Sequence, residues 1–598
     1  MARGADPVGR QLRVGGVHQM KNRQIATVFD EIASLLDLRG ENPFRIRAYL
    51  RAALNIGGLA RDVAEMTDEE IRAVPGIGPD LVGKIRQFLG TGRVDLHEDL
   101  KKEIPAGLLD ILRVPGVGPK TAKTLYEKAG VRSLDDLEAL TREGKLAGLP
   151  GIQKKTEENI RRGIDTLRKG RERHPLGRAR PVADDIVRKL RAKAPLGRIA
   201  VAGSIRRWKE TVKDIDILAT SGKPARVMEA FASLPIIKEV LAHGTTKSSI
   251  LTADGIQVDL RVVGESSFGA ALQYLTGSKE HNIKLREMAS RAGLKINEYG
   301  VFRESDGKRI GGKLEGEVYK SLGLPFIPPE LREDAGEIEA AQGGVLPDLL
   351  TIEDIRGDLH VHTKWSDGAH DLDALVRAAR RKGYQYIAIT DHSKGLAVAR
   401  GLDEKRLREQ IAQIDEANRT LRGFRILTGV EVDIRGDGTL DLADDVLGEL
   451  DIVIASIHSG FRQSREQITA RLLSAVRNPL VGIIAHPSGR LIGERDPYDV
   501  DIDALFREAA ALGVAMEVNA YPARLDLSDH HVRMAKRYGI HLVISTDTHV
   551  TANFDYMEYG VAVARRGWAV PGDVLNTLPC RSLLKRLRSG RTPGARSG

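Results

Sequence analysis

The sequence predicts a multidomain chain: an all-α amino-terminal part, an α/β domain with an α+β domain after it, and a carboxy-terminal α/β barrel. Three observations support this prediction. Helical periodicity dominates residues 20–170, alternating strand patterns begin near residue 198, and short apolar runs after residue 352 end in His, Asp or Glu. A length of 598 residues by itself suggests about three to five domains.

The composition is that of a globular protein. Hydrophobic residues make up 41% and charged residues 29% of the chain, and the net charge of +10 favours a polyanionic partner. Cys580 is the single cysteine, which excludes a disulfide framework and leaves His, Asp and Glu as metal ligands. No apolar run approaches the roughly 20 residues that span a bilayer. We therefore expect a cytoplasmic protein with no membrane segment.

Composition and pattern place the domain boundaries. Residues 1–19 read as a disordered extension or a start-site artefact ahead of Met20. We expect two helical domains at 20–100 and 101–170, an α/β domain at 171–262, an α+β domain at 263–335, a polar linker at 336–351, the barrel at 352–580 and a basic tail at 581–598.

Two nearly identical turns mark the helical part. Val-Pro-Gly-Ile-Gly-Pro covers residues 74–79 and Val-Pro-Gly-Val-Gly-Pro covers 114–119, with a degenerate third copy at 149–152. A Gly-x-Gly turn before a helix exposes consecutive N–H groups that can bind a phosphate whatever the base. The alternative is a pair of plain helix connections. The predicted backbone-phosphate contacts are Gly76, Gly78, Gly116, Gly118 and Lys120.

Three carboxylates are predicted to share one face of the α/β domain. The segment Asp214-Ile-Asp216-Ile follows Gly203-Ser204 at a short offset, and Asp259 lies on a later strand. Strand alternation puts Asp214 and Asp216 on one face, with the isoleucines in the core. Such carboxylates can bridge two Mg²⁺ ions about 3.5–4 Å apart, the arrangement used for phosphoryl transfer.

The last 240 residues carry metal-binding residue types at strand ends. Four of the apolar runs cover residues 386–389, 452–455, 481–484 and 541–544. Parallel strands of an α/β barrel deliver the side chains that follow them to one rim. The metal-binding residue types gathered there lie in the segments 358–363, 366–368, 390–392, 429–433, 456–459, 485–490 and 546–549. Imidazole and carboxylate donors suit several divalent cations and a hydrolytic reaction.

With these motifs, the chain resembles bacterial family X DNA polymerases. In that family a core similar to DNA polymerase beta, with helix-hairpin-helix domains, a nucleotidyltransferase palm and an α+β thumb, is fused to a PHP (polymerase and histidinol phosphatase) barrel, which is a distorted TIM-like α/β fold. The similarity covers residues 20–580, and both halves match by several spaced motifs.

The resemblance implies roles in nucleotide transfer. Asp214, Asp216 and Asp259 would bind Mg²⁺ or Mn²⁺, with Asp259 near the primer 3′-hydroxyl. The implied nucleotide-binding residues are Gly203, Ser204, Arg207, Tyr274, Gly277, Ser278, Asn282 and Arg286. Two departures are visible: Leu275 stands where vertebrate enzymes carry an aromatic residue, and Asp80 replaces a second lysine of the lyase pocket, which weakens the lyase role implied for Lys84.

The resemblance also implies the chemistry of the barrel. It selects nine metal ligands among those segments: His360, His362, Asp367, His392, Glu431, His458, His486, Asp547 and His549. All nine match the metal positions of active PHP domains, which suits up to three Zn²⁺ and/or Mn²⁺ ions. Arg490, shortly after His486, is a candidate for holding a substrate phosphate. His370, His530, His531 and His541 match no ligand position and are expected to be structural.

We therefore predict a monomeric DNA polymerase that fills short gaps during repair. The expected partners are gapped or primer-template DNA and dNTPs, and the PHP domain is expected to act as a 3′–5′ exonuclease, with apurinic-site endonuclease action as a further activity. Two alternatives stay open. The barrel could be an inert scaffold, or the chain could be a PHP phosphoesterase for a small phosphorylated molecule.

Overall fold

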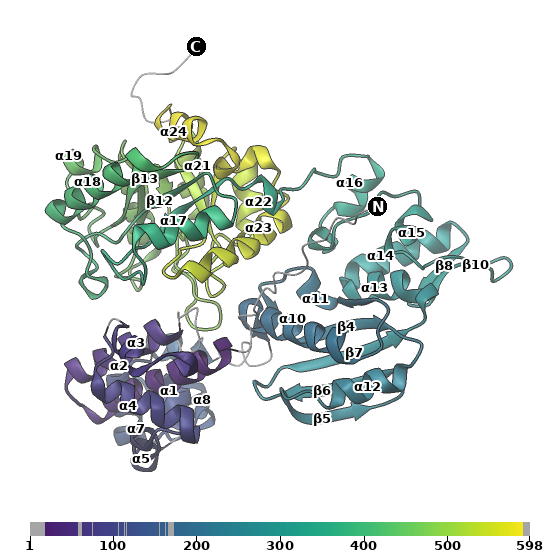
Figure 1. Cartoon of the computed structure of the whole chain (residues 1–598), viewed down its shortest axis with the longest axis horizontal. Helices are drawn as coiled ribbons and strands as arrows, with labels where there is room; N and C mark the ends of the chain where they lie inside the picture. The colour runs from purple at the N-terminus through teal and green to yellow at the C-terminus, as the bar shows by residue number, and fades with distance from the viewer. Residues whose placement is uncertain are drawn as a thin grey trace, which may run out of the picture. The chain divides into compact units, whose positions relative to one another are not determined.

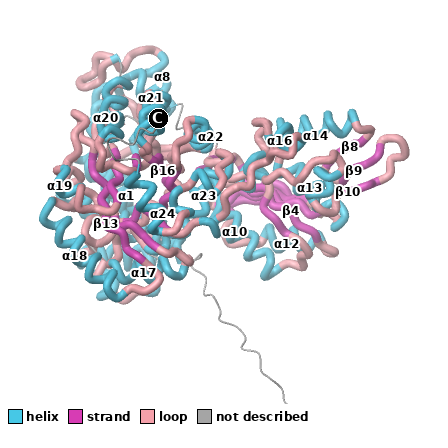
Figure 2. The backbone as a smooth tube through the Cα atoms, turned by 90° about the horizontal axis from the view of Figure 1, so that it is seen from above, coloured by secondary structure: helices cyan, strands magenta, loops and turns pink. Residues whose placement is uncertain are grey.

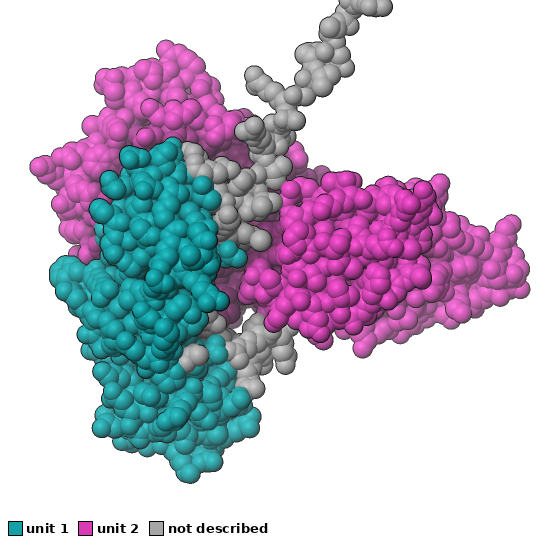
Figure 3. Space-filling view, turned by 60° about the horizontal axis from the view of Figure 1, so that its bottom comes forward, with its two compact units in different colours: residues 1–165 teal, residues 166–598 magenta. Residues whose placement is uncertain are grey.

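The computed structural model describes residues 18–57, 63–74, 76–105, 107–112, 114, 117–154, 156–161, 163–164 and 173–589. The chain divides into two compact units, residues 1–165 and 166–598 (Figure 3). This division lies close to the expected boundary at residue 170. Most of the predicted extension, Gly116 of the second turn and the last nine residues of the basic tail lie outside the described residues.

Unit 1 is all-α, as predicted. Its core includes Phe29 and Ile32 of the first helix, packed with Ile85 of the fourth. Thr67 caps the third helix with a capping box. The helices are α1 (His18–Arg39), α2 (Pro43–Gly57), α3 (Asp68–Arg72), α4 (Pro79–Thr91), α5 (Asp95–Glu103), α6 (Gly107–Leu112), α7 (Pro119–Ala129) and α8 (Leu134–Arg142).

The palm (residues 173–263) is built on a five-stranded sheet of order β2-β4-β7-β6-β5 (Figure 1). Strands β4 and β7 are parallel, and the other pairs are antiparallel. Ile215 and Ile217 pack with the helices α10 (Leu176–Lys193) and α12 (Pro224–Ala232) on one face. The strands are β2 (Ile199–Val201), β4 (Asp214–Thr220), β5 (Ile237–His243), β6 (Lys247–Thr252) and β7 (Gln257–Val263), with the short pair β1 (His174–Pro175) and β3 (Thr211–Val212) beside them.

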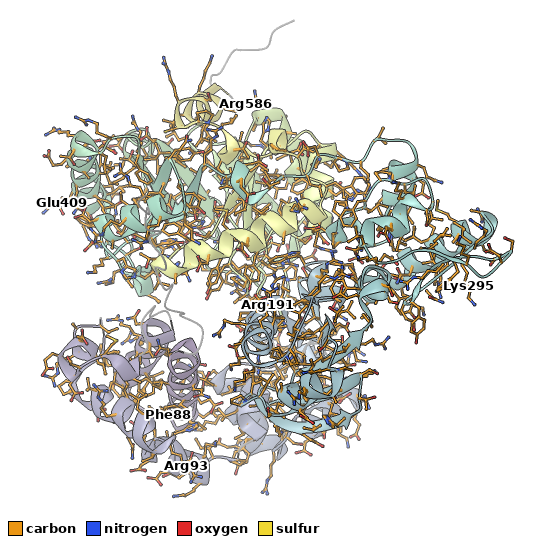
Figure 4. The ribbon with its side chains drawn as sticks, turned by 45° about the vertical axis from the view of Figure 1, so that its right-hand side comes forward. Phe88, Arg93, Arg191, Lys295, Glu409 and Arg586 are labelled. Atoms are coloured by element: carbon orange, nitrogen blue, oxygen red, sulfur yellow. The ribbon has the colours of Figure 1, made fainter. Side chains whose placement is uncertain are left out.

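The thumb (residues 264–342) combines helices with a three-stranded sheet of order β10-β9-β8. Lys295 marks this sheet in Figure 4. Part of the expected linker is a helix, α16, in which Ile338 and Ala341 are buried against Leu285 and Tyr319. Two apolar residues spaced i, i+3 are enough to pack a short helix, although the segment is polar on average. The elements are α13 (Phe268–Thr276), α14 (Lys279–Arg291), β8 (Leu294–Asn297), β9 (Gly300–Arg303), β10 (Arg309–Gly311), α15 (Glu315–Lys320) and α16 (Glu337–Gln342).

The PHP region is a nearly closed barrel of seven parallel strands in sequence order. Thr548, just after the last strand, exchanges backbone hydrogen bonds with His360 and His362 of the first strand region at 3.1 and 2.8 Å. Figure 2 shows the strands in magenta with helices around them. The strands are β11 (Gly357–Val361), β12 (Tyr386–Ile389), β13 (Arg425–Asp433), β14 (Ile452–Ser456), β15 (Ile483–Ile484), β16 (Ala515–Asn519) and β17 (Leu542–Ser545).

Helices surround the barrel and cover its floor. They are α17 (Leu372–Arg381), α18 (Glu404–Thr420), α19 (Asp444–Leu447), α20 (Arg465–Arg477), α21 (Ile502–Leu512), α22 (Asp529–Arg537), α23 (Met557–Arg566) and α24 (Cys580–Ser589). Leu583 and Leu587 of α24 are buried in the cluster that fills the barrel interior. The basic tail predicted from residue 581 therefore begins as a packed helix, which carries Arg586 (Figure 4). Among the described helices, none is long and apolar enough to cross a membrane.

Candidate active sites

The palm brings the three predicted carboxylates together on adjacent strands. Asp216 of β4 lies directly opposite Asp259 of β7 in the sheet, and Asp214 lies two residues earlier on the same face. Gly203 packs against this group with φ +66°, and a Cβ atom there would lie 2.4 Å from Asp216 Oδ2. Glycine is therefore required at this position both by the backbone conformation and by the close approach.

The three carboxylates repel one another. Burial, followed by the charges of Asp214 and Asp259, raises the pKa of Asp216 to about 7. Gln257 Nε2 donates to Asp259 Oδ1 at 3.0 Å, and Lys247 Nζ lies 3.7 Å from Asp259 Oδ2. A cluster of oxygen donors with unbalanced negative charge fits hard divalent cations such as Mg²⁺ or Mn²⁺.

Two of the predicted nucleotide-binding residues meet beside α11 (Gly203–Arg206), the short helix that contains Ser204. Arg207 follows this helix, and its Nε donates to Glu333 Oε1 at 3.0 Å while Nη1 donates to the Thr276 carbonyl. A Cβ atom on Gly277 would lie 3.1 Å from Arg207 Nη1. The structure thus places Gly277 and Arg207 side by side.

The remaining predicted nucleotide-binding residues lie on α13 and α14. Tyr274 is 37% exposed, and its carbonyl accepts from Asn282 Nδ2 at 2.8 Å. Arg286 Nε donates to the Asn282 carbonyl at 3.3 Å. Ser278 is buried and its hydroxyl accepts from the His281 N–H, which makes it the N-cap of α14. Its role in nucleotide binding stays a prediction.

An ion-pair network beside this site was missed by the sequence reasoning. Arg206 donates to both Glu315 carboxylate oxygens at 2.7 Å, and Arg332 Nη1 donates to the same carboxylate at 2.6 Å. Arg332 is fully buried. The partners lie far apart in sequence, so no local pattern predicts this network. The adjacent arginines at 206 and 207 were its only sign in the sequence.

The barrel gathers all nine predicted ligands. Eight of them fall into three groups whose donor atoms lie within 4.8 Å of one another: His362, Asp367, His392 and His549; His360, His362 and Asp547; and His392, Glu431 and His458. The ninth, His486, has its Nε2 2.9 Å from Glu431 Oε1. His486 and Asp547 both have positive φ, +29° and +54°, a strained conformation that often marks functional sites.

Several buried donor atoms of this cluster have no hydrogen-bond partner. They are His360 Nε2, both ring nitrogens of His362, His392 Nδ1, Glu431 Oε2 and His486 Nδ1. Buried polar atoms without partners are costly, and such atoms converging on common points are typical of metal ligands. The residues therefore fit several divalent cations.

The electrostatics of the cluster agree with this assignment. Burial lowers the pKa of His362 and of His486 to about 3, so both imidazoles are neutral donors. Burial also opposes protonation of His392 and His549, but Glu431 raises the pKa of His392 to about 10, and Asp367 raises that of His549 to about 9. Protonated imidazoles here balance carboxylate charge, which is what divalent cations would do.

Three buried carboxylates behind the ligands were not assigned a role from the sequence. Glu517 Oε1 lies 2.7 Å from His360 Nδ1, and its Oε2 accepts from the His486 N–H at 2.7 Å. Asp391 accepts from the Thr363 N–H and hydroxyl, and Asp358 accepts from the His360 N–H. Such partners orient metal ligands. For Glu517 the signal was a charged residue inside the apolar strand at 515–519.

Arg490 forms its contacts with the loop at 524–525 and with the palm. Its guanidinium donates to the carbonyls of Arg524 and Leu525 and lies 2.8 Å from Glu210 Oε2 of the palm. The side chain is 13% exposed. Arg490 therefore joins the barrel to the palm, and its role in holding a substrate phosphate stays a prediction.

The helical turns of unit 1 repeat in three dimensions. Gly78 and Gly118 are the N-caps of α4 and α7 with nearly equal dihedrals, φ −90° and −91°, ψ 174° and 172°. Gly76 has φ +81°, as does Gly151 of the degenerate third copy. A Cβ atom on Gly78 or Gly118 would meet no atom within 4 Å, so packing inside the described fold does not require glycine there.

The predicted lyase nucleophile forms an ion pair. Lys84 Nζ contacts Asp80 Oδ1 one helical turn earlier on α4, and the lysine side chain is 17% exposed. This contact is made by the same Asp80 that departs from the family pattern. The lyase role of Lys84 stays a prediction.

Taken together, the carboxylate palm and the His-rich barrel define an enzyme that couples nucleotidyl transfer to metal-dependent phosphoester hydrolysis. Four family models match the chain: a helix-hairpin-helix domain at 20–94, a SAM-like helix-hairpin-helix tandem at 108–166, the DNA polymerase beta thumb at 271–333 and the PHP domain at 358–520.

One relative matches nearly the whole chain, and two others match parts of it. The chain is 42% identical over 559 residues, 93% of this chain and 97% of the relative, to the DNA polymerase/3′–5′ exonuclease PolX of Bacillus subtilis. The rat DNA polymerase lambda is 24% identical over 52% of this chain and 56% of the relative. A probable phosphatase of Thermoanaerobacter is 31% identical over 37% of this chain and 89% of the relative. The chain belongs to the PolX family of DNA polymerase/3′–5′ exonucleases.

Proposed function

We propose that this protein fills short gaps in DNA with the palm site and trims 3′ ends with the barrel site. The observation that supports this proposal most directly is the opposition of Asp216 and Asp259 across two strands, beside the Gly203 turn. In this proposal Asp214, Asp216 and Asp259 hold Mg²⁺ or Mn²⁺. Asp259 receives the proton of the primer 3′-hydroxyl, and Ser204 and Arg207 hold the triphosphate.

In the barrel, the nine clustered ligands would hold up to three Zn²⁺ and/or Mn²⁺ ions. Such cations, when bound, activate water and neutralise charge on a phosphodiester. The chain's own contribution is to fix the ligands: Glu517 orients His360, and Asp391 holds the Thr363 loop that leads to Asp367. Trimming by this site would remove mispaired or blocked 3′ nucleotides. Apurinic-site cleavage is a second reaction that the same chemistry allows.

Unit 1 would hold the DNA. Gly78 and Gly118 lie at the N-termini of α4 and α7, and a Cβ atom on either would meet no atom within 4 Å, which suits phosphate binding independent of sequence. Lys120 begins the exposed face of α7 beside the second turn. The partners are therefore gapped or primer-template DNA and dNTPs. The cytoplasmic location and the monomeric state stay predictions from the sequence.

The test uses one labelled primer on a gapped template, with and without dNTPs, in Mg²⁺ and in Mn²⁺. Asp214→Ala should reduce extension by about a thousandfold or more, since a metal-bridging carboxylate is lost, and should leave degradation intact. The double variant His360→Ala and His362→Ala should lose degradation and keep extension. Elemental analysis should show that this variant has lost bound metal. Wild-type extension by Asp214→Ala, or undiminished degradation by the histidine variant, would reject the corresponding assignment.

A further inference from the structure

The palm and the barrel meet at the segment that follows Ser204. Helix α23 of the barrel supplies two side chains to this meeting, Tyr559 and Arg566. The Tyr559 ring packs edge-on against Trp208, with 5.6 Å between the ring centroids. Trp208 has a left-handed φ of +56°, so its backbone is held in a conformation that tryptophan rarely adopts. The segment is thus supported from the barrel side.

Arg566 makes the closest contacts of this meeting. Its Nη1 donates to the Arg207 carbonyl at 2.7 Å and to Glu333 Oε1 at 3.0 Å. Its Nε and Nη2 donate to Asp529 Oδ2 at 2.9 and 2.6 Å, which anchors the guanidinium within the barrel. The side chain is only 4% exposed, so these bonds are shielded from water.

Glu333 is shared between the two domains. The same oxygen, Oε1, accepts from Arg566 Nη1 and from Arg207 Nε, each at 3.0 Å. Burial opposes ionisation of this carboxyl, yet Arg207 and Arg566 together keep its pKa below the usual value. Arg207 is therefore held at its backbone carbonyl and its Nε, in addition to the Nη1 bond to the Thr276 carbonyl. Arg566 contacts both the Arg207 carbonyl and Glu333, the partner of Nε.

We propose that Arg566 of the PHP barrel is a positioning residue for nucleotide binding in the palm, acting through Arg207 and Glu333. This inference rests on the proposed function, in which Arg207 holds the triphosphate of the incoming nucleotide. A guanidinium that is already held in place binds a phosphate with higher affinity, because less conformational freedom is lost on binding. The PHP domain is then part of the polymerase pocket as well as a separate hydrolytic site.

The neighbouring residue gives a matched control. Arg565 lies on the same helix and also bonds to the thumb, through Glu330 Oε1 at 2.8 Å, and to the Leu350 carbonyl at 2.7 Å. Its hydrogen bonds go to Glu330 and Leu350, away from Arg207 and Glu333. Replacing Arg565 therefore removes an arginine that bridges barrel and thumb. It leaves the contacts among Arg566, Arg207 and Glu333 in place.

The experiment measures single-nucleotide gap filling by the full chain in Mg²⁺, and 3′ degradation by the same preparations. Arg566→Met should raise KM for the dNTP by about tenfold, the effect of losing charge-assisted hydrogen bonds, with kcat and degradation nearly unchanged. Arg566→Lys should restore part of the affinity, and Arg565→Met should leave KM at the wild-type value. Adding Arg566→Met to Arg207→Met should raise KM no further.

The outcomes separate the two hypotheses. If Arg207→Met leaves KM for the dNTP unchanged, the proposed nucleotide role of Arg207 is wrong. If Arg207→Met raises KM but a folded Arg566→Met does not, or Arg565→Met raises it equally, the positioning role of Arg566 is wrong. If circular dichroism shows that Arg566→Met does not fold, Glu333→Gln tests the same proposal. A rise in KM for the dNTP supports positioning of Arg207 through Glu333, and an unchanged KM overturns it.

Discussion

At the scale of single residues, Glu517 supports the metal cluster more directly than any other side chain outside it. It is fully buried and contacts the ring of one ligand, His360, and the backbone N–H of another, His486. A carboxylate on the far nitrogen of an imidazole fixes the tautomer and direction of the ring. The two ligands thus depend on one strand residue.

Replacing Glu517 should therefore weaken metal binding without touching the palm. Glu517→Ala should lower the metal affinity of the full chain by about 10–100-fold. Degradation should fall in proportion, and gap filling should persist. Metal titration beside both assays checks this. The control is Glu508→Gln on α21. This change removes a surface carboxylate that pairs with Arg477 of α20. An unchanged metal affinity in Glu517→Ala would show that the carboxylate has no orienting role.

At the scale of elements, the role of the two Gly-x-Gly turns in DNA binding can be tested separately from their role in folding. Gly78 and Gly118 have extended backbone dihedrals that other residues adopt readily, and threonine caps helices about as well as glycine does. Gly78→Thr with Gly118→Thr should therefore leave folding stability within about 1 kcal/mol of wild type. The added side chains should nevertheless obstruct phosphate approach.

DNA affinity should then fall similarly for all sequences, and the remaining binding should depend less steeply on salt. Fluorescence anisotropy with two unrelated gapped duplexes across a salt series measures both quantities. Unchanged affinity for both duplexes would mean that the turns only connect helices. A loss confined to one sequence would indicate base contacts in place of phosphate contacts.

The elements also show what the sequence could and could not predict. Period-two alternation was enough to put Asp214 and Asp216 opposite the core isoleucines, because strand geometry leaves two faces only. Apolar runs that end in His, Asp or Glu indicated the rim of the barrel where these residues gather, and the family resemblance selected the nine predicted ligands. Glu333 and Arg566, in contrast, are 233 residues apart, and no local pattern predicts which distant charge a given arginine meets.

At the scale of the whole molecule, removing metal should lower the stability of the barrel. Ligand imidazoles and carboxylates are buried together at its rim, so a cation that binds only the folded state adds stability. At a free metal concentration of about 100 times Kd the gain is about 2.7 kcal/mol, which for a domain of this size corresponds to about 5–10 °C in Tm.

Thermal unfolding of the chelated full chain, with and without added Mn²⁺, checks this effect. Wild type should show the rise in Tm, and the variant with His360→Ala and His362→Ala should show little. Asp214→Ala should behave as wild type, since its site binds cations in the palm. An equal rise in all three proteins would place the stabilising ion outside the barrel cluster.

Helix α24 has a practical consequence for gene truncation. Leu583 and Leu587 are part of the apolar cluster inside the barrel. A protein that ends before Cys580 therefore exposes the apolar residues that α24 covers. Such a product is expected to aggregate, since a large apolar surface becomes exposed. A mutant lacking residues 580–598 would then report on solubility, and its lost activity should not be assigned to the deleted segment as a catalytic defect.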